Sequence, residues 1–272
     1  MIDYRVLLKL QDKYAVRLKR AFIYRARQTR KKFDKNLTIR SMQLGFEAVY
    51  NSLRWEPLFP MPILASAYKE TWKKMDVKKE AVVLDAEQFT MPNPAAERWL
   101  WTYAGNEVAE ITTADKKMIQ GILAQGMKDK ETYEQTADRL YQSIGLTESQ
   151  AKAVQNYHDT LVNAGHKPKV VERLTEAYYN KMLSYRAETI SITETANAVN
   201  AAWTDYVQDA SRRGVLPETE YELKWLATPS DRTCDECMSM NGRTGEISTG
   251  EIDGKIAPLH PRCRCVLTVS KK

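Results

Sequence analysis

The sequence has few of the residues that most often carry catalysis or bind metals: only four of its 272 residues are cysteine and three are histidine. It has no apolar run near the roughly 18 residues that a membrane-spanning helix needs. It also has no signal-peptide pattern that would direct it to an oxidising compartment. We therefore expect a soluble protein of intracellular origin that has no membrane partner.

Several catalytic motifs are also absent. The chain has no GxSxG elbow, no GxGxxG fingerprint, no HExxH helix and no HxE followed by PCxxC. The segment Gly250–Lys255 ends in Gly-Lys but lacks the earlier glycine of a phosphate-binding loop. We therefore expect no enzyme and no small-molecule substrate.

Charge is distributed unevenly along the chain. The first 40 residues hold 13 lysines and arginines against three aspartates, whereas the remainder is net acidic, so that the whole chain carries a net charge of +6. In residues 2–33, apolar side chains recur every three or four positions, as on one face of a helix. This predicts a basic amphipathic helix.

Such a helix can bind nucleic acid or an acidic protein partner, or it can simply present a solvated charged face. The basic residues that could make these contacts are Lys9, Lys13, Arg17, Lys19, Arg20, Arg25, Arg27, Arg30, Lys31 and Lys32.

A second helix is expected over residues 37–54, and three prolines between Trp55 and Pro62 then predict a boundary. Thr147 and Gln150 have the spacing of a capping box, which fixes the start of one later helix. The middle of the chain is read as helices over residues 63–75, 95–110, 113–126, 130–143 and 147–163, with an extended segment at 81–84.

The longest regular pattern covers residues 170–213 and predicts one long helix, ended by Gly214. Alternating apolar and charged residues then predict a strand at Tyr221–Trp225, paired with Val266–Val269. The expected fold class is α+β and predominantly α-helical, with a long central helix and a small C-terminal β-sheet domain that carries a Cys/His cluster. The expected domains are a basic helical N-terminal arm (1–56), a helical middle region (63–168) and a C-terminal domain (169–272).

All four cysteines and one histidine lie within 32 positions, in the runs Cys234-Asp-Glu-Cys237 and His260-Pro-Arg-Cys263-Arg-Cys265. Thiolate and imidazole are ligands that zinc selects, and two such clusters can close a tetrahedron. We expect Cys234, Cys237 and Cys263, with either His260 or Cys265, to hold one structural zinc. Buried reduced thiols, a redox pair and a disulfide are the alternatives.

Two runs carry a family resemblance. Trp225-Leu-Ala-Thr-Pro-Ser-Asp-Arg-Thr-Cys234-Asp-Glu-Cys237, followed by Gly242 and then Pro258-Leu-His-Pro-Arg-Cys-Arg-Cys265, resembles the C-terminal signature of phage Mu F-like head morphogenesis proteins. Upstream, Arg186-Ala-Glu-Thr-Ile-Ser-Ile-Thr-Glu194 is similar to the helix that precedes this signature. The resemblance spans about residues 120–268.

The resemblance implies a structural minor capsid protein of a tailed phage, assembled in the host cytoplasm and resident in the virion. Its implied partners are the portal protein, the major capsid protein or both, in the capsid interior during head assembly and during packaging or ejection of DNA. One alternative is a metal-dependent nuclease or transferase that uses His260 with Asp231, Arg232, Arg262 and Arg264. The other is an accessory protein that binds nucleic acid through the basic helix.

Overall fold

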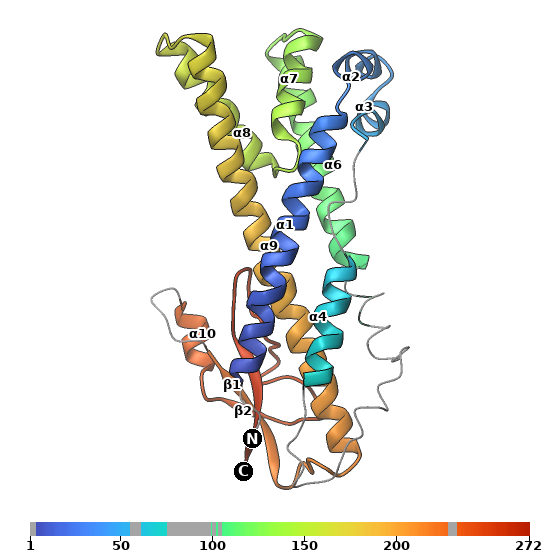
Figure 1. Cartoon of the computed structure of the whole chain (residues 1–272), viewed down its shortest axis with the longest axis vertical. Coiled ribbons are helices and arrows are strands. Elements are labelled where there is room, and N and C mark those ends of the chain that lie inside the picture. The colour runs from blue at the N-terminus through green and yellow to red at the C-terminus, as the bar shows by residue number, and fades with distance from the viewer. Residues whose placement is uncertain (1–3, 55–60, 75–98, 100–101, 103–104, 228–232) are drawn as a thin grey trace. The chain divides into compact units, whose positions relative to one another are not determined.

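The computed structural model describes residues 4–54, 61–74, 99, 102, 105–227 and 233–272. Over these residues the chain is mostly helical, with one small antiparallel sheet near its C-terminus (Figure 1). The predicted α+β class is therefore confirmed. The predicted extended segment at 81–84 lies outside the described residues.

The strands among the described residues all come after residue 220, and one short helix, α10, lies between the first two of them. The helices are α1 (Arg5–Lys32), α2 (Lys35–Met42), α3 (Phe46–Ser52), α4 (Met61–Lys74), α6 (Gly105–Lys128), α7 (Tyr133–Ser143), α8 (Glu148–Asn163), α9 (Pro168–Arg212) and α10 (Asp235–Met240). The strands are β1 (Tyr221–Leu226), β2 (Thr244–Gly245) and β3 (Val266–Lys271).

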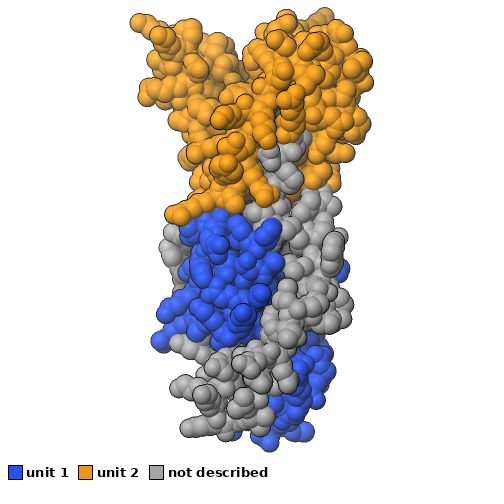
Figure 2. All heavy atoms as spheres, turned by 45° about the vertical axis from the view of Figure 1, so that its right-hand side comes forward, with its two compact units in different colours: residues 1–18, 61–104, 188–272 blue, residues 19–60, 105–187 orange. Residues whose placement is uncertain are grey.

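Spatial contacts group the chain into two compact units, coloured in Figure 2. Unit 1 contains residues 1–18, 61–104 and 188–272, and unit 2 contains residues 19–60 and 105–187. Both units are discontinuous in sequence, because α1 and α9 each contribute residues to both. The division into residues 1–56, 63–168 and 169–272 stays a prediction.

Unit 1 has an aromatic core on its helices. Tyr68 of α4 is buried with Ala202 of α9, and the rings of Tyr68 and Trp99 stack at a centroid distance of 5.4 Å. The Tyr68 hydroxyl donates a hydrogen bond to Asp205. Trp72 meets the edge of Tyr206 with ring centroids 5.5 Å apart. Large ring surfaces such as these bury much apolar area, which fixes α4 on this part of α9.

The sheet of unit 1 has the strand order β2-β1-β3, and both pairings are antiparallel. The predicted partnership of β1 with β3 is confirmed, in a register that places Leu223 opposite Val269 and Trp225 opposite Leu267. Leu223, Trp225 and Leu267 are completely buried, so the alternation seen in the sequence marks the inward face. The short strand β2 and helix α10 were not predicted.

Unit 2 is built from helices with well-defined starts. The predicted capping box at Thr147 is confirmed: its hydroxyl accepts a hydrogen bond from the Gln150 backbone N–H, and the Gln150 side chain accepts one from the Thr147 backbone. Thr132 and Gln135 form the same arrangement at the start of α7. Each box satisfies two backbone donors that would otherwise lack partners.

Four of the helix predictions need correction. The helix expected over 37–54 is two helices, α2 and α3, because Gly45 adopts a left-handed φ of +97° between them. Residues 105–110 of the helix expected over 95–110 run together with the helix expected over 113–126 as α6, which is continuous from Gly105 to Lys128. Most of residues 95–104 lie outside the described part of the chain. The helix expected from residue 130 begins at Tyr133, behind the Thr132 cap.

The apolar side of the basic helix α1 is packed within each of the two units. Its predicted apolar stripe is confirmed in unit 1 by Leu7, Leu10, Tyr14 and Leu18, which are all at most 3% exposed. In unit 2 the stripe continues through Phe22, which is completely buried. The hydrophobic face of α1 is thus covered within the chain itself.

Candidate metal centre

The first cysteine pair lies at the start of α10. Cys234 is the residue that caps this helix, and its sulfur accepts a hydrogen bond from the Cys237 backbone N–H at 3.4 Å. Cys234 is exposed, whereas Cys237 is buried. The CxxC spacing therefore places both sulfurs on one side of the first helical turn.

The second cluster lies on a tight turn before β3. The Cys263 backbone N–H donates to the His260 carbonyl at 3.0 Å, and Arg262 within this turn has a left-handed φ of +67°. Cys263 closes this turn and Cys265 directly precedes β3, and both are buried. The turn thereby directs His260 back toward the first pair.

The structure brings all five predicted donors together. Nε2 of His260 lies 3.2 Å from the sulfurs of both Cys234 and Cys237, and the sulfurs of Cys237 and Cys263 are 3.6 Å apart. A tetrahedral zinc with bonds of about 2.3 Å to sulfur spaces its sulfurs about 3.8 Å apart. The separation of 3.6 Å between the sulfurs of Cys237 and Cys263 is close to the spacing of two sulfurs on one zinc.

His260 is oriented as a metal ligand would be. Its Nδ1 lies 2.9 Å from the Pro261 carbonyl oxygen, which can only accept a hydrogen bond, so Nδ1 carries the proton. In the neutral ring, Nε2 then has a free lone pair directed at the sulfurs of Cys234 and Cys237. Metal-bound histidines commonly make such a bond from their second nitrogen to a carbonyl.

The thiols differ strongly in acidity. The Cys237 backbone N–H lowers the pKa of Cys234, whereas burial raises the pKa of Cys237 to about 12. A hydrogen bond from the Cys265 thiol lowers the pKa of Cys263 to about 5, and the same bond raises the pKa of Cys265. Cys263 is thus the thiol most prepared to act as an anionic ligand.

The five donors form two overlapping triads. The donor atoms of Cys234, Cys237 and His260 lie within 4.8 Å of one another, as do those of Cys237, Cys263 and Cys265. Cys237 belongs to both triads. Such a Cys/His cluster can hold a metal ion, with Cys237 at the centre of its ligand set.

Residues outside the cluster anchor it to α9, and sequence reasoning missed this role for them. The Asn200 side chain donates to the Cys265 carbonyl at 3.0 Å in a buried position. The Arg262 backbone N–H donates to the Thr193 hydroxyl at 2.9 Å. Thr193 was singled out in the sequence only as part of the family motif, and its spacing from the cluster carries no signal of contact.

A comparison with protein families identifies the family of this chain. A family model described as phage Mu protein F like protein matches residues 117–268, which is more than half of the chain. The chain belongs to the phage Mu F-like family. No curated protein and no solved structure matches it. No helix among the described residues is both long and apolar enough to cross a bilayer.

Family membership indicates a phage head-morphogenesis protein with capsid-related partners. The matched range contains the whole Cys/His cluster and its anchors on α9. The run that connects Trp225 to the first cysteine pair includes residues 228–232, which lie outside the described residues, and with them Asp231 and Arg232.

The basic residues of α1 fall into two groups. Those with exposed side chains are Lys9, Lys13, Arg17, Arg20, Arg27, Lys31 and Lys32. Lys19, Arg25 and Arg30 are partly buried. Within unit 1, Lys13 is ion-paired with Glu70, so an exposed position on this helix does not by itself mean an uncommitted charge.

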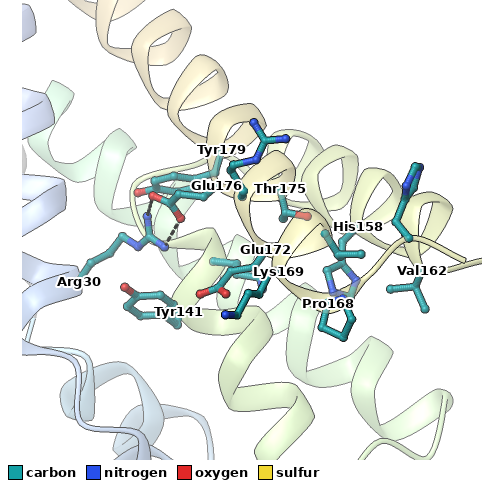
Figure 3. A pocket seen from close by; sticks show the side chains of 14 residues that line it. Arg30, Tyr141, His158, Val162, Pro168, Lys169, Glu172, Thr175, Glu176 and Tyr179 are labelled. Carbon is teal, nitrogen blue, oxygen red and sulfur yellow. Dashed lines mark hydrogen bonds and ion pairs between the residues drawn. The ribbon is translucent and has the colours of Figure 1, made fainter.

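Arg30 is held in a cavity of about 670 Å³ in unit 2 (Figure 3). Its guanidinium donates to both carboxylate oxygens of Glu176 at 3.0 Å and lies between the rings of Tyr141 and Tyr179, 4.2 and 4.0 Å from their centroids. His158 lines the same cavity and contacts Asp159 at 3.0 Å. Arg30 is thus committed to internal contacts within the helices of unit 2.

Proposed function

We propose that this protein is a structural minor capsid protein that acts in head assembly and binds the portal protein, the major capsid protein or both. The observation that carries the proposal is the family match over residues 117–268, which includes the Cys/His cluster. On this proposal the protein is assembled in the host cytoplasm and resides in the virion, on the capsid interior, during packaging or ejection of DNA.

The test of this role is location and binding. Antibody or mass-spectrometric detection in purified phage heads should find the protein in the particle, and immobilised portal or major capsid protein should retain it. Absence from heads together with no retention by either protein would contradict the proposal.

We further propose that the cluster holds one structural zinc ion through Cys234, Cys237, His260 and Cys263. His260 is favoured over Cys265 as the fourth ligand because its Nε2 lies 3.2 Å from two sulfurs while its Nδ1 is bonded to a carbonyl. Cys265 then supports the ligand beside it, because its backbone N–H donates to the sulfur of Cys263 at 3.5 Å. Zinc would supply a fixed tetrahedral crosslink between α10 and the turn before β3.

Elemental analysis of protein purified without chelator tests the metal, and we expect about one zinc per chain for a filled four-ligand site. Cys265→Ser should keep the zinc, whereas His260→Ala should lose most of it. A Cys265→Ser variant free of zinc beside a zinc-loaded His260→Ala variant would reverse the ligand assignment.

The proposed centre has a structural role in place of a catalytic one. Four protein ligands fill a tetrahedral zinc and leave no position for a reactive water. The alternative nuclease or transferase would use His260, Arg262 and Arg264 with added divalent ions. Incubation of wild type and His260→Ala with DNA tests it, and cleavage by wild type alone would establish an enzyme.

A second candidate function is DNA binding through α1. The specific observation is the set of exposed lysines and arginines on a helix whose apolar face is already covered. Binding through phosphates should weaken steeply with salt, because each neutralised phosphate releases counterions.

Arg20→Glu with Arg27→Glu should abolish such binding, and Arg30→Gln should change it little, because Arg30 is already paired with Glu176. Salt-independent binding would indicate an acidic protein partner.

A further inference from the structure

The turn that carries His260 and Cys263 is held to α9 by Arg262, the residue directly before Cys263. The guanidinium of Arg262 donates to the Glu188 carboxylate at 2.7 Å and to the Thr189 hydroxyl at 3.3 Å. Its backbone N–H donates to the Thr193 hydroxyl at 2.9 Å. These partners lie at i, i+1 and i+5 on α9, so Arg262 contacts two successive turns of the helix.

The backbone conformation of Arg262 is unusual for an arginine. Its φ of +67° lies in the left-handed region, which glycine adopts readily and a residue with a long side chain rarely does. The Arg262 side chain is also partly buried, at 31% exposure. An arginine at a position that suits glycine implies that its side-chain contacts offset the backbone cost.

The Thr193 hydroxyl is oriented to accept the hydrogen bond from the Arg262 backbone N–H. It donates its own proton to the Thr189 carbonyl at 2.8 Å, and its oxygen therefore presents a lone pair to the Arg262 N–H. On the other side of Cys263, the buried Asn200 side chain bonds the Cys265 carbonyl at 3.0 Å. The segment that carries His260, Cys263 and Cys265 is thus held to α9 on both sides of Cys263.

We infer that Arg262 is the positioning residue of the metal centre, and that metal loading is coupled through it to the docking of the 260–265 turn on α9. The inference rests on the metal site proposed above. The contacts of Arg262 hold His260 and Cys263 in place before the ion arrives, so that binding does not have to order the turn. Residues that orient metal ligands typically contribute about 10- to 100-fold to metal affinity.

The coupling must act in both directions. If docking on α9 strengthens metal binding, then metal binding strengthens docking by the same factor. Zinc should therefore protect the amide of Arg262 from hydrogen exchange, because that amide is bonded to Thr193 on α9. The site then serves to join the sheet module to the long helix as well as to close a loop.

The test compares Arg262→Gly with Arg264→Ala in the full chain. Glycine suits the left-handed backbone, so Arg262→Gly removes the side-chain contacts without adding strain. Arg264 is two residues away and pairs with Asp12 at 2.8 Å, which makes it a matched loss of an arginine ion pair. Zinc affinity is measured by competition with a chromophoric chelator. We expect Arg262→Gly to bind about 10- to 100-fold more weakly, and Arg264→Ala to stay within about 2-fold of wild type.

Two further readouts separate positioning from general damage. The Co²⁺-loaded Arg262→Gly variant should keep the wild-type absorption spectrum, because its ligand set is unchanged. Thr193→Val removes the acceptor of the Arg262 N–H and should weaken zinc binding by a smaller factor than Arg262→Gly. Arg262→Lys keeps the charge but not the two-pronged contact, so its affinity should fall between those of glycine and wild type.

The possible failures can be told apart. Equal zinc affinity for wild type and Arg262→Gly would overturn the positioning role while leaving the metal centre intact. An equal loss of zinc affinity in Arg264→Ala would also overturn the positioning role, because loss of any nearby arginine contact would then weaken zinc binding to the same extent. Wild type that binds no zinc would overturn the proposed centre and, with it, this inference.

Discussion

The C-terminal module, which we define as residues 221–272, and the helices of unit 2 are stabilised in different ways. Helices α7 and α8 begin at capping boxes made by residues three positions apart. The module instead depends on contacts between residues far apart in sequence, such as Arg262 with Thr193, and on five sulfur and nitrogen donors gathered from two turns. Local signals thus define the helices, whereas long-range contacts and the proposed metal define the module.

The largest effect is expected from breaking the module at its centre. Cys237→Ser removes the thiol common to both donor triads and should release the zinc. Structural zinc sites can supply on the order of 10 kcal/mol of apparent binding energy, so the module should lose its ordered state. Limited proteolysis should then cut within residues 233–265, while circular dichroism keeps most of its helical signal.

A strong chelator applied to wild type should reproduce this pattern, and added zinc should reverse it. Chelator-treated protein that stays protease-resistant over residues 233–265 would show that packing of the thiols and hydrogen bonds are sufficient for the module.

The second effect tests the core of unit 2. Arg186 and Asp115 form a buried ion pair at 3.0 Å, with side chains only 6% and 5% exposed, and Arg186 lies over the ring of Phe22. Arg186→Ala would leave Asp115 buried without its cation and should destabilise the protein by about 3–5 kcal/mol. Chemical unfolding measures this loss.

The paired variant Arg186→Met with Asp115→Leu removes both charges and keeps comparable volume. It should recover most of the stability, because no uncompensated charge stays buried. A double variant as unstable as Arg186→Ala would show that packing around the pair, and not its charge, is what matters. Zinc content should be unchanged in both variants, which separates unit 2 from the module.

The sequence predicted best what depends on local pattern. The periodicity of residues 170–213 gave α9 within two residues at each end, and Thr147 gave the start of α8. The alternation in Tyr221–Trp225 gave β1 and its partner, and the cysteine spacing indicated the cluster. For α9, β1 and the start of α8, the signal and the structure lie in the same stretch of chain. For the cluster and the strand pairing, the sequence indicated which residues take part but not the long-range contacts that bring them together.

What the sequence missed is set by distant contacts or by single backbone angles. The break at Gly45 depends on one left-handed residue inside an otherwise helical pattern. The role of Arg262 depends on Glu188 and Thr193, about 70 positions away, and no spacing rule connects them. The preference for His260 over Cys265 needed the bond between Nδ1 and the Pro261 carbonyl.

A third and smaller effect is expected at the helix starts. Thr132→Ala and Thr147→Ala each remove an N-cap and should destabilise unit 2 by about 1 kcal/mol. Thr160→Ala is a suitable control, because Thr160 lies inside α8 and its hydroxyl bonds the Asn156 carbonyl one turn behind it. Thermal unfolding measures the stability of the three variants. A loss of stability in Thr160→Ala equal to that in the other two would show that the N-cap positions contribute no more than a threonine inside the helix.

The smallest effect concerns a surface contact in unit 1. The Glu70 carboxylate accepts hydrogen bonds from Lys13 and, at 2.6 Å, from the Tyr14 hydroxyl. These bonds lower the pKa of Glu70 to about 2, and the bond from Lys13 is the largest cause. An unfolded glutamate has a pKa of about 4.3. The stabilisation is therefore complete above about pH 4.3 and is lost as the pH falls toward 2, because the folded state holds its carboxylate charged over that range.

Solvent screening keeps this contribution below about 1 kcal/mol, since the Lys13 side chain is 48% exposed. A double-mutant cycle of Lys13→Met with Glu70→Gln isolates the coupling from the other titrating carboxylates. We expect a small coupling energy at about pH 6 that vanishes near pH 2 and shrinks in about 1 M salt, where the screening length is about 3 Å. A coupling energy that persists near pH 2 would mean that the two side chains interact mainly through apolar packing of the lysine stem. The stability of unit 1 would then depend less on charge than the contacts of Glu70 suggest.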